Sequence, residues 1–170
     1  MFTFDQQLLP KLYRIRQHKD TPELADPAQA LAAQMQSFSG AIKPGARIGI
    51  AAGSRGIWNY ASYIKTVADS VKKAGGIPYI IPAMGSHGGA NAQGQLEVLH
   101  GYGITPQSMG CEILSSMETV ILGETQSGAP VHFDQNAAGM DGIILVNRVK
   151  PHTDFHAGIE SGVVKQMVVG

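Results

Sequence analysis

A short apolar segment, a glycine-rich loop and a helix-forming segment follow one another twice in this chain. The first unit runs from Arg47–Ala52 through the loop GSRG to an amphipathic stretch over residues 60–74. The second runs from Ile77–Pro82 through MGSHGG to residues 92–100. This alternation is typical of a mostly parallel β-sheet. We therefore predict an α/β fold in three layers, with helices on both faces of the sheet.

Local signals predict the other elements. Asp26 before Pro27 is typical of a helix N-cap followed by proline at the first helical position, so a helix should run to about Phe38. Residues 12–15 alternate as an edge strand does. Further strands are expected over residues 112–114, 119–122, 130–133 and 143–146. No repeat or internal linker divides the chain, so residues 1–170 are expected to form one domain.

The loops after the parallel strands should meet at one edge of the sheet, because crossovers between parallel strands are right-handed. Ligands of open α/β sheets bind at that edge. In the first loop, Ser54 supplies a hydroxyl, and Arg55 a guanidinium suited to a carboxylate or phosphate. We expect both to contact a substrate, although a surface arginine in a glycine turn is the simpler alternative. The G-x-x-G spacing is not a dinucleotide-binding fingerprint.

The second loop places Ser86 and His87 between glycines. Flanking glycines allow the backbone to approach a substrate closely, and an imidazole can transfer a proton near neutral pH. Ser86 is therefore a candidate substrate contact and His87 a candidate catalytic residue. A histidine with a purely structural role is the alternative.

The third loop is the richest in reactive side chains. The apolar residues 142–146 lead into NRVKPHTDFHAGIESGVVK, at residues 147–165. Pro151 and Gly158 favour a loop there. A zinc site made from His87, His152 and His156 is one possibility. Lys165 lies in an apolar run, where it either extends its amine to solvent or is buried for chemistry, as a nucleophile.

Composition excludes several classes. The chain has 13 basic and 13 acidic residues, which argues against a nucleic-acid or anionic-membrane partner. The single cysteine, Cys111, excludes an internal disulfide framework. Residues 1–11 lack the basic and apolar regions of a signal peptide, and no apolar run reaches membrane-spanning length. A cytoplasmic location is therefore expected.

The sequence ends inside an apolar segment, at Gly170. Domains tend to end in polar residues, so we expect a fragment whose remaining residues lie elsewhere. Residues 163–169 are then expected either to be disordered or to contact a second copy of the chain, in a crystal or in a homo-oligomer.

Three motifs resemble a known family. GSRGI at residues 53–57, PAMGSHGG at residues 82–89 and the long motif at residues 147–165 are similar to the nickel-pincer-dependent lactate racemases and their uncharacterised relatives. KPGARIGIAAGSRG, GITPQSMGCEI and GAPVHFD also resemble the N-terminal domain of that family, so the resemblance extends from about Leu9 onward.

The resemblance implies that residues 1–170 are the truncated N-terminal domain, without its C-terminal partner domain, of a two-domain α/β isomerase. This isomerase would be a racemase or epimerase of 2-hydroxy acids. Its cofactor would be a nickel-pincer nucleotide, covalently held by Lys165, which accepts a hydride from the substrate's α-carbon. His87 and His152 would be the catalytic acid–base pair, and Arg55 would bind the substrate carboxylate. We expect this chain alone not to retain the nickel cofactor.

Departures from the racemases bear on the substrate. Ala52 stands where the racemases have an acidic residue, and the family's nickel ligand that follows the lysine would lie beyond Gly170. The loop between His152 and Lys165 is also longer and more polar, so a sugar acid is a better expectation than lactate. Two other functions stay open: a protein that binds a small anionic metabolite without racemising it, and a zinc-dependent hydrolase that uses the three histidines named above.

Overall fold

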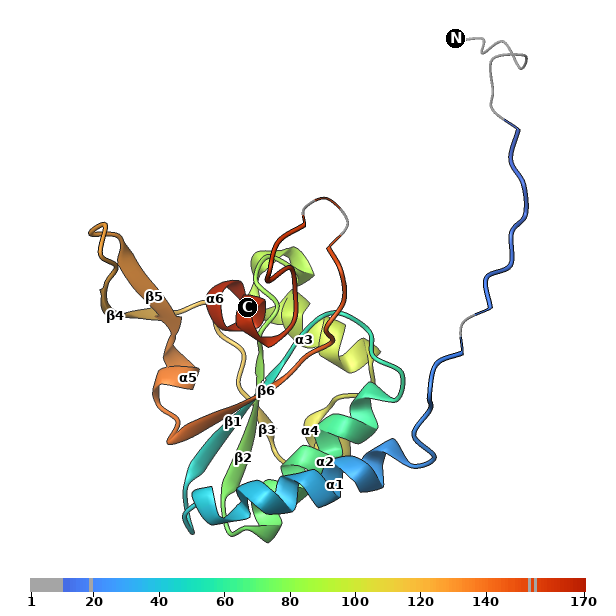
Figure 1. Ribbon diagram of the computed structural model, residues 1–170. Helices are drawn as coiled ribbons and strands as arrows, with labels where there is room; N and C mark the ends of the chain where they lie inside the picture. Colours follow the sequence, from blue (N-terminus) through green and yellow to red (C-terminus); the bar gives the residue numbers. More distant parts are fainter. Residues whose placement is uncertain (1–10, 19, 153, 155) are drawn as a thin grey trace.

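The structure is a computed structural model that describes residues 11–18, 20–152, 154 and 156–170. Its centre is a parallel sheet with the strand order β3-β2-β1-β6 (Figure 1). Two further strands form a separate antiparallel hairpin. The strands are β1 (Arg47–Ala52), β2 (Ile77–Pro82), β3 (Glu112–Ile113), β4 (Thr119–Glu124), β5 (Pro130–Asp134) and β6 (Gly142–Val146). The helices are α1 (Pro27–Phe38), η2 (Ser39–Ala41), α2 (Tyr60–Lys73), η3 (Gly88–Ala90), α3 (Ala92–Gly101), α4 (Pro106–Met109), α5 (Gln135–Ala138) and α6 (Val163–Val169).

One face of the sheet carries the core. Ile50 of β1 and Ile80 of β2 are fully buried in the same cluster as Ile64 and Val67 of α2. Met35 of α1 belongs to this cluster, and α1 packs against α2. Burying each such aliphatic side chain contributes roughly 1.5–3 kcal/mol. This apolar layer holds β1 and β2 in place, and so fixes the positions of the loops that follow them.

The sheet's carboxyl edge is aligned by strand register. Ala52 lies opposite Pro82 on one side and Val146 on the other. Three parallel strands therefore end at the same level, and their following loops begin side by side. Helix α6 lies above this edge (Figure 1).

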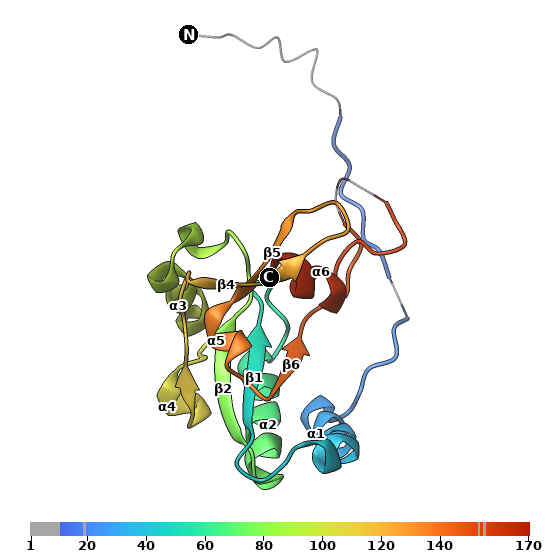
Figure 2. The same ribbon diagram turned by 90° about the vertical axis from the view of Figure 1, so that its left-hand side faces the viewer.

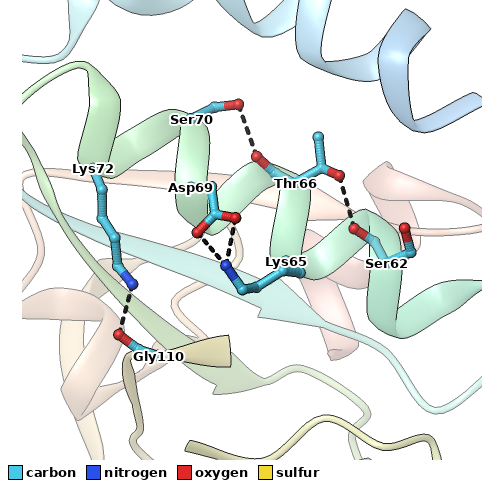
Figure 3. Close-up of polar contacts among 7 residues, drawn as sticks. All are labelled: Ser62, Lys65, Thr66, Asp69, Ser70, Lys72 and Gly110. Atoms are coloured by element: carbon cyan, nitrogen blue, oxygen red, sulfur yellow. Dashed lines mark hydrogen bonds and ion pairs between the residues drawn. The ribbon is translucent and has the colours of Figure 1, made fainter. Parts of the chain in front are cut away.

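Helix α2 shows how local signals define an element. Its polar side carries the Lys65–Asp69 ion pair and hydroxyls of Thr66 and Ser70 that donate to carbonyls one turn earlier (Figure 3). Near its end, Lys72 donates from Nζ to the Gly110 carbonyl, at 2.6 Å, and so ties α2 to the end of α4. The chain leaves the helix through Gly75, whose φ of +88° suits glycine.

The β4–β5 hairpin extends beyond the parallel sheet (Figures 1 and 2). Its register shifts between Ile121 and Gly123, which marks a bulge or irregularity. Ile121 and Leu122 are both exposed. Helix α5 connects this hairpin to β6.

Most predicted elements are confirmed, and the prediction of a mostly parallel α/β sheet is correct. The edge strand predicted at residues 12–15 is wrong, because the described residues 11–18 contain no strand and Leu12 is 93% exposed. Alternation alone does not make a strand when no neighbouring strand supplies hydrogen bonds. Three complete layers and a second domain remain predictions. No helix among the described residues is long and apolar enough to span a membrane.

Candidate functional site

A cleft of about 250 Å³ lies at the carboxyl edge of the sheet. Its walls come from the loops after β1, β2 and β6 and from α6. The predicted site residues among its lining are Ser54, Arg55, His87, His152 and Lys165. Ser86 is exposed and is not among the lining residues, so it does not join the others. Segments more than a hundred residues apart in sequence thus meet at one cleft, at the edge where ligands of α/β sheets bind.

Two tyrosines hold the loop that carries Ser54. Buried Tyr60 accepts at Oη a hydrogen bond from the Gly53 N–H, at 2.8 Å. Tyr102 donates its hydroxyl to the Ser54 carbonyl, at 2.7 Å. The two rings pack edge to face, with centroids 5.8 Å apart. These hydrogen bonds hold the backbone just before and just after the Cα of Ser54, a residue that lines the cleft.

Burial raises the pKa of Tyr60 to about 12. The unfolded chain should lose this proton near the ordinary value of 10, two units earlier. We predict that the free energy of unfolding is unaffected by this group below pH 10 and falls by about 2–3 kcal/mol as pH rises to 12. Urea unfolding of wild type and Tyr60→Phe across this range measures the effect. Tyr60→Phe should show less alkaline loss, whereas Tyr13→Phe, at an exposed tyrosine, should behave as wild type; equal loss in all three would contradict the prediction.

Ser54 and His87 are in direct contact. Ser54 Oγ lies 2.5 Å from His87 Nδ1, which joins the loops after β1 and β2. When Nδ1 carries the proton and donates to Oγ, Nε2 is an available base. In the other tautomer Oγ donates to Nδ1, and Nε2 is a proton donor. The contact therefore orients the imidazole and is compatible with either direction of proton transfer.

Close backbone packing sets the course of the His87 loop. Gly88 has a φ of +68°, and a side chain there would strike the backbone of Gly94 and Gln95. Buried Gln95 donates from Nε2 to the Gly85 carbonyl, at 2.9 Å. Asn91 caps α3 by accepting from the Gly94 N–H, at 2.8 Å. Gly88 is therefore needed for packing against α3.

The loop over residues 147–162 is closed at its base by side-chain hydrogen bonds. Asn147 donates from Nδ2 to the Gly162 carbonyl, at 3.1 Å. The Lys150 N–H donates to Ser161 Oγ, at 2.9 Å, and the Ser161 hydroxyl donates back to the Lys150 carbonyl. Neither helix nor strand occurs among the described residues of this loop, as the sequence predicted. Thr153 and Phe155, both part of the family-like motif, lie outside the described residues.

Glu160 holds the part of this loop that carries His152. Its carboxylate accepts from the His152 N–H at 2.8 Å and from the Ala157 N–H at 3.1 Å. His156 Nδ1 lies 3.4 Å from the same carboxylate. The hydrogen bond from the His152 backbone is the main reason that the pKa of Glu160 is lowered, and that from Ala157 is the second.

Acid should loosen this loop through Glu160. Because the folded pKa is below the ordinary value of 4.5, the contribution of Glu160 is complete above pH 4.5 and is lost as pH falls through the folded pKa. We predict that the amide resonances of His152 and Ala157 shift together as pH falls below 4.5. NMR titration measures this. Glu160→Gln should remove the shared transition and Glu124→Gln, on the hairpin, should preserve it; independent titration of the two amides in wild type would argue against the clamp.

Helix α6 brings Lys165 to the cleft. The sequence left open whether the Lys165 side chain extends to solvent or is buried. Lys165 is exposed and lines the cleft, so its side chain reaches solvent. The next residue, Gln166, is only 6% exposed and donates from Nε2 to the Ala51 carbonyl at 3.2 Å and, more weakly, to that of Ala83 at 3.5 Å. Its Oε1 is buried without a hydrogen-bond partner among the described residues. Gln166 thus attaches helix α6 to the ends of β1 and β2. The only sign of this role in the sequence is that Gln166 is a polar residue within an apolar run.

The cleft is strongly basic. Its lining includes Arg55, Arg148, Lys150 and Lys165, and none of its described lining residues is acidic. No hydrogen bond or ion pair joins these four cations to a carboxylate within the described part of the chain. Such a lining suits an anionic ligand.

The structure does not bring His87, His152 and His156 together as the predicted zinc site requires. Among the described residues, no three histidine, cysteine, aspartate or glutamate side chains are close enough to hold a metal ion. His87 and His152 line the cleft, whereas His156 does not and contacts Glu160.

A larger cavity, of about 840 Å³, lies between α1 and the sheet. Its lining is mainly aliphatic, and Lys43 and Asp141 are its only titratable residues among those described. The larger cavity therefore has few groups that could take part in chemistry, whereas the smaller cleft contains most of the predicted site residues.

Comparison with known families and with curated proteins found no match for this chain.

Proposed function

We propose that this protein is a racemase or epimerase of 2-hydroxy acids, related to the nickel-pincer lactate racemases. The observation that carries the proposal is the meeting of two histidines, an arginine and a lysine in one cleft without any described carboxylate. These four residues come from three strand-following loops and α6.

Each side chain has a role suited to its chemistry. Arg55 binds the substrate carboxylate through its guanidinium and so orients the α-carbon. His87 and His152, on loops after different strands, serve as acid and base for the hydroxyl in the two configurations. One base could not reach the hydroxyl in both orientations, which is why the reaction calls for a pair. Ser54 orients His87 through their hydrogen bond.

The positive charge of the residues that line the cleft is compatible with the negative charge of the implied nickel-pincer nucleotide. The amine of Lys165 is exposed at the cleft and is available for covalent attachment, and the basic lining suits a nucleotide phosphate. When bound, this group supplies the acceptor and donor of the α-hydride. The cleft is smaller than the roughly 300–1,000 Å³ usual for small-molecule sites, so the second domain implied by the resemblance would complete its walls.

The test uses full-length protein produced in cells that also make the cofactor. We expect nickel, a mass increase confined to the peptide containing Lys165, and interconversion of 2-hydroxy acid enantiomers with transfer of an α-deuterium label. Lys165→Ala should lose the added mass, whereas Lys43→Ala, at the other cavity, should retain it. Unmodified Lys165 and no interconversion under these conditions would overturn the proposal.

The second candidate is a protein that binds a small anion without converting it. The basic lining, which has no carboxylate among its described residues, favours this function independently of the histidines. Binding of a 2-hydroxy acid by wild type without label exchange, unchanged in His87→Ala, would select it over the racemase.

A further inference from the structure

Two cations of the cleft, Arg148 and Lys150, take no part in the proton and hydride transfers of the proposed reaction. Both lie in the loop after β6 and line the cleft with Arg55 and Lys165. Within the proposed function, Arg55 binds one carboxylate and Lys165 holds the cofactor. Arg148 and Lys150 are therefore a surplus of positive charge at the same cleft.

The backbone around these two cations is held in place. The Arg148 N–H donates to Asn147 Oδ1 at 2.7 Å, and Asn147 in turn donates to the Gly162 carbonyl. Lys150 is bound through both its N–H and its carbonyl to Ser161. Side chains projecting from a fixed backbone lose less freedom on binding a ligand than those on an unrestrained loop.

Counter-charge for these cations is missing from the described protein. The described ion pairs join Lys65 to Asp69 and His156 to Glu160, both outside the cleft lining. Lys150 Nζ donates to a carbonyl, that of Pro151, at 3.2 Å. Like charges gathered at one cleft repel one another, and an anionic ligand relieves that repulsion.

We propose that Arg148 and Lys150 form a second anion subsite, which binds a second acidic group of the substrate. The inference rests on the proposed function and narrows its substrate class to 2-hydroxy acids with a distal carboxylate or phosphate. Arg55 binds the carboxylate next to the reacting carbon, and the loop after β6 binds the distal group.

Calorimetric binding to full-length protein tests this without requiring turnover. The probes are L-lactate, with one acidic group, L-malate, with a distal carboxylate, and 3-phosphoglycerate, with a distal phosphate. We expect at least one two-acid probe to bind about tenfold more tightly than lactate at low salt. The preferred probe identifies the distal group.

The matched variants are Arg148→Met with Lys150→Met, and Lys73→Met as an exposed cation in the last turn of α2. The double variant should bring the preference for the two-acid probe close to unity, because it should weaken binding of that probe much more than binding of lactate. Lys73→Met should keep the preference. If the subsite is correct and the proposed function is not, this pattern appears without enantiomer interconversion.

Three results would overturn the subsite. The first is equal binding of lactate and both two-acid probes by wild type. The second is a preference for a two-acid probe that survives the double variant. The third comes from nicotinate mononucleotide as a further probe. If the double variant weakens that probe alone, the two cations serve the nucleotide phosphate and not the substrate.

Discussion

Replacing either His87 or His152 by alanine should reduce enantiomer interconversion by about 10²–10⁴-fold, the usual contribution of a general acid or base. The two imidazoles approach the cleft on loops after different strands, so neither should substitute for the other. The measurement is the steady-state rate in both directions with deuterium at the α-carbon, using full-length protein that carries the cofactor. Each variant should also shift the pH dependence of the remaining rate.

The matched control is His132→Ala. His132 lies on the β4–β5 hairpin, where its Nδ1 contacts Thr119 Oγ1 at 3.1 Å, and it is not among the cleft residues. Its removal should leave the rate unchanged. Near wild-type rates in both cleft variants would show that the histidines are not the acid–base pair and would favour the anion-binding alternative.

Gly94→Ala should destabilise the fold by about 3 kcal/mol, the upper part of the range for overpacking. A Cβ at this position would lie 1.9 Å from the Gly88 carbonyl oxygen, and neither backbone can move without displacing the His87 loop or α3. Urea unfolding should show a lower midpoint with an unchanged slope. Because the clash lies beside His87, ligand binding at the cleft should weaken as well.

Gly101→Ala is the control within the same helix, because a Cβ there would have no neighbour within 4 Å. Alanine has the higher helix propensity, so this variant should be neutral or stabilising, by up to about 1 kcal/mol. Equal midpoints for the two variants would show that Gly88 and Gly94 are not as tightly packed as the structure indicates.

The sequence was most informative where local pattern and packing agree. Arg47–Ala52 and Ile77–Pro82 are short apolar runs between turns, and both are strands with the predicted bounds. Asp26 and Pro27 begin α1 as expected, with Asp26 Oδ1 accepting from the Gln29 N–H. These elements depend on capping residues and on apolar runs, and both can be recognised within a single segment of the sequence.

Elements that depend on distant partners were not predictable in the same way. Val163–Val169 is rich in β-branched residues, yet it forms helix α6, which Gln166 attaches to the Ala51 carbonyl. That contact spans 115 residues, and no spacing in the sequence encodes it.

The candidate site shows the same division. Topology alone was enough to predict that Arg55, His87 and His152 lie at one edge of the sheet, because parallel strands present their loops there. The pairing of Ser54 with His87 and the clamp by Glu160 depend on side-chain positions in three dimensions. Sequence position alone also failed for Ser86. It is adjacent to His87 in the sequence, but it is not among the residues that line the cleft.

The way in which the loop over residues 147–162 closes has an evolutionary consequence. Its described side-chain contacts join its own two arms, through Asn147, Ser161 and Glu160, and none of these residues belongs to the buried core. Substitutions within the loop can therefore alter the preference of the proposed anion site while leaving the folding free energy of the sheet largely intact. Ligand preference can diverge among descendants of such a chain faster than the scaffold that presents it.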